Sequence, residues 1–306
     1  MRPLLLTAYG VSIKTKDRKI VLWNQDTDKR EEWLPRDFPF DSIIIEHLGG
    51  FLTFPALRWL STNGVSLTAL DFNGSVLGSW LPDYPVNARD RLAQYAAFAD
   101  ERRRVSVARF ILEEKLGHAV PRIYQSVPDL LVYEARQAEA YWSDLGITRD
   151  YPNARDPTNA TINYASGLLL SRALLSCHRA GLEPSVGFLH EWRDHKPSLC
   201  LDLVEPFRAD MVRTALKVRK GLKQTDFGEV FGHGLRLRPQ AAHSLVTAFA
   251  RTFKDREIDA FTSRLNLRFA VSGRAEPSPM LLPSRAIGCR TAETARPPLS
   301  EGARFA

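Results

Sequence analysis

The segment Gly181–Arg208, GLEPSVGFLHEWRDHKPSLCLDLVEPFR, contains a histidine and two acids that are the main candidates for functional residues. His190 ends an apolar Gly-Phe-Leu lead-in, and Asp202 and Glu205 stand three residues apart where a leucine-rich run becomes a helix. An imidazole together with carboxylates is a ligand set that suits a divalent cation. The segment therefore predicts a metal site beside the start of a helix.

A further acid, Glu134, lies in LLVYEARQAEAYW (130–142), where an acid is unexpected. If this segment is a helix, the residues on the same face as Glu134 are Leu131, Ala138, Tyr141 and Leu145. A carboxylate in an apolar stripe is costly to desolvate unless a cation or a hydrogen-bond donor meets it. The alternative to a metal is an ion pair with an arginine such as Arg136 or Arg172.

Each of the other residues also has an interpretation without a metal. A single histidine such as His190 is more often a satisfied core residue. Asp202 can cap the helix that Pro206 helps to open, and Glu205 in the first turn is favoured by the helix dipole. Taken together, Glu134, His190 and Glu205 are the predicted catalytic metal ligands, with Asp202 in support. Hard cations prefer oxygen ligands and Mn²⁺ also accepts imidazole, so we expect Mg²⁺ or Mn²⁺.

The positive charge of the chain is unevenly placed. Residues 1–85 hold 9 Lys and Arg against 10 Asp and Glu, whereas residues 86–306 hold 33 against 25. Beside a metal site, a basic surface favours a polyanion such as nucleic acid; a solvated face without a partner is the alternative. On the helix after Pro206, basic residues form two neighbouring rows, one of Arg213, Lys217 and Lys220 and the other of Arg219 and Lys223. These rows predict contacts with a DNA backbone.

The pattern of short strands followed by helices predicts an α+β, multi-domain fold, in which a β-rich N-terminal domain precedes an all-α catalytic domain. We place the β-rich domain at residues 1–82, a proline-bounded linker at 83–89 and the helical domain at 90–273. Residues 274–306 are rich in Pro, Ser and Arg and lack periodicity, which predicts a disordered tail. The expected strands are Pro3–Ala8, Val11–Thr15, Lys19–Trp23, Ser42–Glu46, Val65–Asp71 and Ser75–Ser79, and the expected helices are Thr53–Asn63, Ala88–Leu116, Ser126–Leu145, Ala160–Ala180, Pro206–Leu222 and Leu237–Ala270.

Two further features narrow the class of protein. The three cysteines lack C-x-x-C spacing and are odd in number, so neither a disulfide framework nor a zinc site is indicated. No apolar run approaches the length of a signal-peptide core or a membrane span, so we expect a cytoplasmic protein without a membrane partner.

The order and spacing of four motifs resemble the universal CRISPR-associated endonuclease and integrase of spacer acquisition, over roughly residues 1 to 270. The motifs are Glu134-x6-Tyr141-Trp142, Asn159-x3-Asn163-Tyr164, Gly181-Leu182-x-Pro184-x2-Gly187-Phe188-x-His190 and Leu201-Asp202-Leu203-x-Glu205-x-Phe207-Arg208. One departure is Glu205, since the last acid is Asp in some members of the family. The longer arm changes the reach of the ligand without changing its type.

The resemblance implies a metal-dependent integrase and nuclease. In the family, a 3′-hydroxyl on a captured DNA duplex attacks a phosphodiester in the CRISPR repeat, and water as the attacking group gives nuclease activity. The glutamate, the histidine and the last acid would bind the ion, and Tyr164 and Tyr141 would support the scissile phosphate or a ligand. The implied partners are double-stranded DNA, a second copy of the chain held through the N-terminal domain, and a small ferredoxin-like CRISPR-associated companion.

Two other functions fit the same residues. A catalytically silent DNA-binding scaffold would use the basic helices alone, and a stand-alone repair nuclease would cut branched DNA without any CRISPR role. Loss of metal-dependent cutting on substitution of Glu134 would exclude the scaffold. A genome neighbourhood without a repeat array would favour the repair nuclease.

Overall fold

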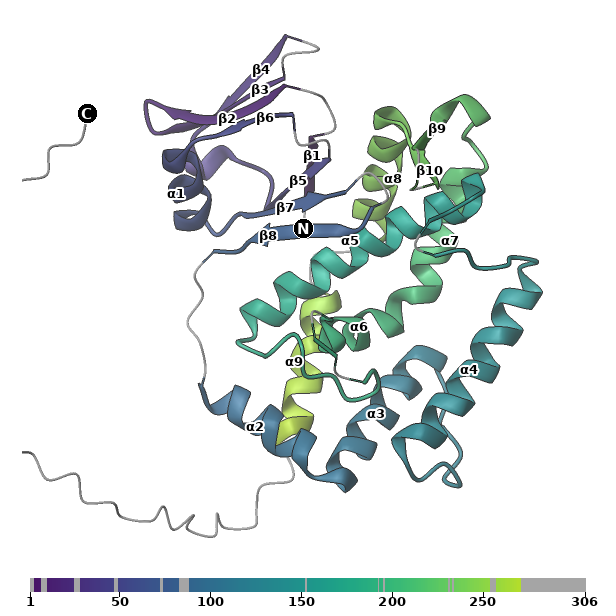
Figure 1. Cartoon of the computed structure of the whole chain (residues 1–306). Helices are drawn as coiled ribbons and strands as arrows, with labels where there is room; N and C mark the ends of the chain where they lie inside the picture. The colour runs from purple at the N-terminus through teal and green to yellow at the C-terminus, as the bar shows by residue number, and fades with distance from the viewer. Residues whose placement is uncertain are drawn as a thin grey trace, which may run out of the picture. The chain divides into compact units, whose positions relative to one another are not determined.

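A computed structural model describes residues 3–6, 10–24, 28–46, 49–71, 74–82, 88–151, 153–191, 193–194, 196–230, 232, 234–253 and 257–270. The predicted tail at 274–306 and most of the predicted linker, 83–87, lie outside the described residues. Strands occupy the first part of the chain and helices dominate the second, as Figure 1 shows, so the predicted α+β class is confirmed.

Two four-stranded sheets form the N-terminal part. The first has the order β1 (Pro3–Leu6), β5 (Ser42–Glu46), β7 (Ser66–Leu70), β8 (Val76–Trp80), with β1, β5 and β7 parallel and β8 antiparallel to β7. The second has the order β4 (Lys29–Trp33), β3 (Lys19–Asn24), β2 (Val11–Lys16), β6 (Gly50–Leu52). Helix α1 (Phe54–Thr62) starts at Thr53, whose hydroxyl accepts a hydrogen bond from the Ala56 amide.

The inner strands of the first sheet, β5 and β7, are buried on both faces, whereas β8 is largely exposed. Successive residues of a strand point to opposite faces, and here they join different cores. Ile43 and Leu67 are register partners and pack with Trp59 and Leu60 of α1. Leu5 and Ile44 are also register partners, but they belong to the core of the helical part. The sheet therefore supports α1 on one side and the helical part on the other.

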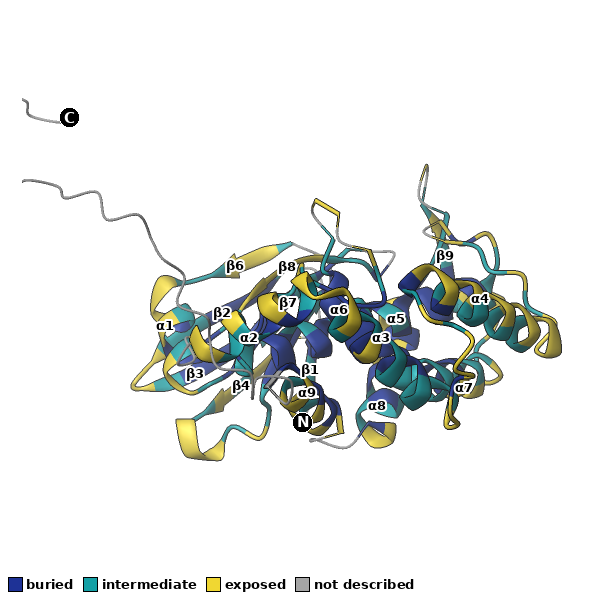
Figure 2. Cartoon of the chain, turned by 90° about the horizontal axis from the view of Figure 1, so that it is seen from below, coloured by how far each residue is buried: buried dark blue, intermediate teal, exposed yellow. Residues whose placement is uncertain are grey.

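Helix α5 (Pro157–Arg179) is the centre of the helical part, and most of its positions are buried. It begins at Asp156, whose carboxylate accepts hydrogen bonds from the amides of Thr158 and Asn159. Helices α6 (Ser198–Val204), α7 (Arg208–Arg219), α8 (Pro239–Thr252) and α9 (Glu257–Ala270) pack against it. The helical part also contains α2 (Ala88–Ala99), α3 (Glu101–Leu116) and α4 (Val127–Asp144), of which α2 and α3 pack on α9 and α4 packs on α3. Exposed positions lie along the outward sides of α4 and on β6 (Figure 2).

Where the first sheet meets α5, the two backbones come unusually close. A side-chain carbon at Gly167 would lie 1.6 Å from the carbonyl oxygen of Gly74, in the turn before β8. Three residues earlier on α5, the Tyr164 hydroxyl donates a 3.2 Å hydrogen bond to Oε2 of Glu46, at the end of β5. Glycine at both positions is required for this contact, which fixes α5 against the sheet.

The all-helical expectation for the second part is wrong at one place. Strands β9 (Phe227–Val230) and β10 (Gly234–Leu237) pair in antiparallel orientation. Two expected long helices are also each divided, α2 from α3 at Asp100 and α8 from α9 after Thr252. Asp100 begins the new helix because its carboxylate accepts a hydrogen bond from the Arg103 amide. No helix among the described residues is long and apolar enough to cross a membrane.

Candidate active site

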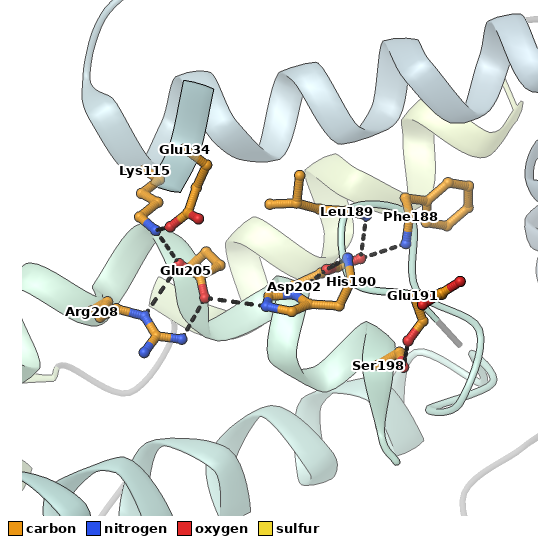
Figure 3. A network of polar contacts seen from close by, with 10 residues as sticks. All are labelled: Lys115, Glu134, Phe188, Leu189, His190, Glu191, Ser198, Asp202, Glu205 and Arg208. Atoms are coloured by element: carbon orange, nitrogen blue, oxygen red, sulfur yellow. Dashed lines mark hydrogen bonds and ion pairs between the residues drawn. The ribbon is translucent and has the colours of Figure 1, made fainter. Parts of the chain in front are cut away.

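Two of the predicted ligands meet at a lysine. Lys115, near the end of α3, contacts Oε1 of Glu134 on α4 and lies 2.7 Å from Oε2 of Glu205, which begins the 3₁₀ turn η2 (Glu205–Phe207). Figure 3 shows the ammonium between the two carboxylates. The side chains of Lys115 and Glu205 are 13% and 3% exposed, so this contact is shielded from water. The structure therefore brings Glu134 and Glu205 to one cation, which is part of the protein itself.

Glu205 also pairs with Arg208, at the start of α7. The Arg208 guanidinium contacts both carboxylate oxygens, with Nε 3.2 Å from Oε2. Burial alone would raise the pKa of Glu205, but the charges of Arg208 and Lys115 outweigh it and lower that pKa to about 2. Glu205 is thus held ionised, and the pKa of Arg208 is correspondingly raised despite its burial.

His190 is oriented by Asp202 on α6. The buried Asp202 carboxylate accepts hydrogen bonds from the amides of Phe188 (2.5 Å), Leu189 (3.1 Å) and His190 (2.9 Å). The same carboxylate lies 2.8 Å from Nδ1 of the imidazole, and Nε2 lies 3.7 Å from Oε1 of Glu205. Asp202 therefore fixes both the loop and the ring, and it directs the opposite ring nitrogen toward Glu205 (Figure 3).

These contacts bear on two of the alternatives that the sequence left open. Asp202 lies within α6 and does not cap the helix that follows. Glu134 pairs with Lys115 rather than with an arginine; Arg172 instead lies 3.8 Å from Asp41. In the part of the chain that the structure describes, no group of three or more His, Cys, Asp or Glu side chains is arranged to hold a metal ion. The predicted ligands converge, but with lysine and arginine as their counter-ions.

The two tyrosines occupy different surroundings. Tyr164 is 1% exposed and its hydroxyl is bonded to Glu46, so it belongs to the contact between sheet and helix. The hydroxyl of Tyr141 is buried and has no hydrogen-bond partner within the described residues. Burial raises the pKa of Tyr141, with opposing contributions from Arg213 and Asp210 of α7. Of the two, Tyr141 keeps an unused polar group between α4 and α7.

A cavity of about 760 Å³ opens beside this site. Its lining includes His190 and Arg208 from the charged cluster, together with Trp142, Arg149 and Lys196. Apolar residues of α5 form much of the remaining wall. The site therefore adjoins a space large enough for part of a substrate.

The predicted basic rows are only partly available to a ligand. Lys217, Lys220 and Lys223 are exposed, and Arg213 is exposed but paired with Asp210. Arg219 is half-buried, donates to the carbonyl of Leu222 at 2.9 Å and lies over the Phe227 ring. Arg219 therefore holds β9 against α7, and the three lysines remain the candidates for phosphate contact.

Sequence reasoning missed Lys115 and gave no role to Arg208 or Arg149. Lys115 sits in the charged run Glu113-Glu114-Lys115, which reads as a solvated helix end. Only the packing of α3 against η2 shows that its ammonium is buried. The spacing of Glu205 and Arg208, at i and i+3, is the one signal that could have indicated their pairing.

These features define a class: an α+β protein whose helical part holds acidic, histidine and basic side chains at the edge of a cavity. A family model described as CRISPR associated protein Cas1 matches residues 4–120 and 117–251. The chain belongs to this family.

Relatives and solved structures agree with this assignment. The CRISPR-associated endonuclease Cas1 1 of Thermus thermophilus is 33% identical over 316 aligned positions, covering 93% of this chain and 96% of the relative. A casposase bound to its integration product has a TM-score of 0.75 and 26% identity, covering 88% of this chain and 91% of that one. A chain of a Cas6-RT-Cas1–Cas2 complex has a TM-score of 0.69 and 16% identity, covering 88% of this chain and 35% of that one, a likeness of fold alone.

Proposed function

We propose that this protein is a metal-dependent DNA endonuclease and integrase that inserts captured DNA into a CRISPR array by transesterification. Membership of the Cas1 family and the likeness to a casposase support a nuclease and integrase role. The observation that carries the proposal is that Glu134 and Glu205 share one buried cation and that His190, which lines a cavity, lies 3.7 Å from Glu205.

By chemical type the donors suit Mg²⁺ or Mn²⁺, although the described side chains are not arranged around a metal position. Two carboxylates and one imidazole nitrogen are ligands that Mn²⁺ accepts, and Mg²⁺ accepts the carboxylates. The two carboxylates already share a cation, the Lys115 ammonium, which marks the place where a positive charge is stabilised. Glu134, His190 and Glu205 would hold the ion, and Lys115 would have to move from between the carboxylates. When bound, such an ion activates an attacking hydroxyl and neutralises charge on the phosphoryl transition state.

The protein's own residues prepare this reaction by orientation. Asp202 holds the imidazole through Nδ1 and so presents Nε2 on the side of Glu205. Lys115 and Arg208 keep Glu205 ionised, which maintains a ligand of fixed charge. In strand transfer, the 3′-oxygen of the captured DNA forms a new bond to phosphorus. The bond from phosphorus to the 3′-oxygen of the target strand breaks, and that oxygen leaves as a hydroxyl.

Substitution of Glu134 tests the proposal directly. We expect Glu134→Ala to abolish Mn²⁺-dependent strand transfer and cleavage while DNA binding, measured by fluorescence anisotropy, stays within about threefold of the wild type. Glu139→Ala is the matched control, because Glu139 is an exposed acid on the same helix. The reason is that loss of one metal ligand removes the charge stabilisation on which phosphoryl transfer depends.

The same assays separate the rival functions. A silent scaffold would bind DNA and show no metal-dependent activity in the wild type. A repair nuclease would cut branched DNA but would not join a free 3′ end to a CRISPR repeat. Equal activity of the wild type and Glu134→Ala would contradict the proposed site.

Partners follow from the same proposal. Large apolar side chains are exposed on the N-terminal part, namely Phe51, Phe54, Leu77 and Trp80. We infer that a second copy of the chain covers them, which light scattering at several concentrations would test. A small companion protein of the kind present in the Cas1–Cas2 complex, and double-stranded DNA, complete the proposed assembly. A monomer at all concentrations, with and without the companion, would contradict the dimer.

A further inference from the structure

Arg149, in the loop between α4 and α5, is a cation held by neutral groups. Its two terminal nitrogens donate to the side-chain oxygens of Asn159 and Asn163, the second at 2.8 Å. Its guanidinium also lies 5.1 Å from the ring centre of Trp142. Both asparagines are nearly fully buried, at 3% and 4% exposure, so their amide oxygens are rigid acceptors. The side chains in direct contact with the guanidinium are therefore neutral.

The acids nearest to Arg149, Asp156 and Asp150, act on its charge without forming an ion pair with it. Among the described residues, no ion pair joins Arg149 to an aspartate or glutamate. Burial lowers the pKa of Arg149, and the nearby positive charge of Arg208 lowers it further, while the carboxylates of Asp156 and Asp150 oppose this shift in part. A half-buried guanidinium beside a second one is costly unless an anion joins them. This arrangement points to a ligand that is absent from the protein chain.

The cavity identifies the kind of ligand. Arg149, Lys196, Arg208 and His190 line the same space of about 760 Å³. Arg208 is neutralised by Glu205, whereas Lys196, like Arg149, has no ion pair among the described residues. Two cations without a direct ion pair in one cavity, next to the carboxylates that would bind metal, match a phosphodiester anion.

We propose that the guanidinium of Arg149 binds a non-bridging oxygen of a DNA phosphodiester in this cavity, with Lys196 as a second contact and Asn159 and Asn163 as its positioning residues. This inference rests on the proposed function and adds a phosphate-binding residue outside the predicted ligand set. The planar guanidinium can use the donors that face away from the asparagines for the phosphate.

A purely structural role for Arg149 is disfavoured by how the loop is anchored. The Asn159 side chain accepts from the Asp150 amide at 3.0 Å and donates to the Thr148 carbonyl at 2.9 Å. The Asn163 side chain donates to the Asp150 carbonyl at 3.0 Å. These bonds hold the loop backbone without the Arg149 side chain, so its removal leaves the loop in place.

The test combines substitution with phosphate chemistry. Arg149→Gln removes the charge, Arg149→Lys keeps it, and Arg155→Gln is the matched control on the same loop, since the Arg155 side chain is 91% exposed. The substrate is a duplex with a free 3′ end and a target duplex, made with single methylphosphonates at each phosphate around the joint. Readouts are the strand-transfer rate with Mn²⁺, metal-free DNA affinity by anisotropy, and thermal unfolding.

We expect Arg149→Gln to lower the strand-transfer rate about 10- to 100-fold, the loss of one hydrogen bond to a charged group, and Arg149→Lys to recover part of it. One methylphosphonate should weaken wild-type binding and transfer while leaving Arg149→Gln almost unchanged. A merely structural residue would lower activity equally at every methylphosphonate position, which would overturn the inference. So would wild-type activity in Arg149→Gln, whereas an inactive wild-type protein would overturn the proposed function itself.

Discussion

Glu46 offers a quantitative test of how the first sheet is joined to α5. It is fully buried at the end of β5, receives one hydrogen bond from Tyr164, and its Oε1 atom has no hydrogen-bond partner among the described residues. Burial raises the pKa of Glu46 from 4.5 to about 7, although Tyr164 and Arg236 oppose this shift. Near neutral pH the folded protein therefore binds a proton that the unfolded chain has released.

The sign of the effect follows from this difference. Because the folded pKa lies above the unfolded one, the stabilising contribution is fully present below pH 4.5 and is lost as the pH rises through 7. A pKa shift of this size corresponds to about 3 kcal/mol, of which roughly 2.5 kcal/mol falls between pH 5 and pH 8. The glutamine in Glu46→Gln cannot ionise. Between pH 5 and pH 8 the unfolding free energy of this variant should therefore fall by roughly 2.5 kcal/mol less than that of the wild type.

Urea unfolding at pH 5 and pH 8 measures this difference. The loss of unfolding free energy from pH 5 to pH 8 is measured for the wild type and for Glu46→Gln, and the two losses are subtracted. The contributions of the other titrating groups cancel in this subtraction. Glu191→Gln, at an exposed acid, is the control and should follow the wild type. If Glu46→Gln and the wild type lose the same free energy between the two pH values, Glu46 is not buried in the manner described.

Three further outcomes are expected. Lys115→Met should raise the Mn²⁺ affinity measured by calorimetry, because the Lys115 ammonium between the two carboxylates competes with the ion. It should also lower the melting temperature of the metal-free protein, in which the two carboxylates lose their counter-ion. An unchanged Mn²⁺ affinity would refute the competition. Gly167→Ala should cost about 3 kcal/mol in urea unfolding, since its new carbon meets backbone, whereas Gly228→Ala, with open space around it, should cost little. Lys217→Gln should weaken DNA binding and reduce the salt slope by about 0.9, whereas Arg219→Gln should mainly lower stability, and equal effects on both would contradict the placement of Arg219.

The sequence predicted the fold best where local pattern and tertiary structure agree. Strand β5 was placed at its bounds, and α4 and α5 were found by their apolar periodicity. It failed for β4, KREEW, because an edge strand with exposed charged residues lacks an apolar alternation. It also failed for β6, which is three residues long and is defined only by pairing with β2. Such strands are stabilised by pairing with a neighbouring strand, so their own sequences contain little pattern that predicts them.

The sequence alone could single out the carboxylates of the candidate site, but it could not single out the cations that pair with them. Glu134 was conspicuous because it interrupts an apolar helix face, and His190 and Asp202 were found together in one motif. Lys115 and Arg149 carry no such anomaly, since a lysine at a helix end and an arginine in a loop are ordinary. Their importance arises from packing: one is buried between acids, and the other is held by two buried amides.

Charge at the site links its two halves. With the imidazole counted as neutral, Glu134, Asp202 and Glu205 against Lys115 and Arg208 leave a net charge of −1. A DNA phosphate that approached this cluster would be repelled, and adding a divalent ion changes the balance to +1. Arg149 and Lys196, which line the same cavity, attract the phosphate independently of that ion. DNA affinity should therefore depend on Mn²⁺ more steeply in Arg149→Gln, because the ion then supplies most of the attraction that it otherwise shares with Arg149.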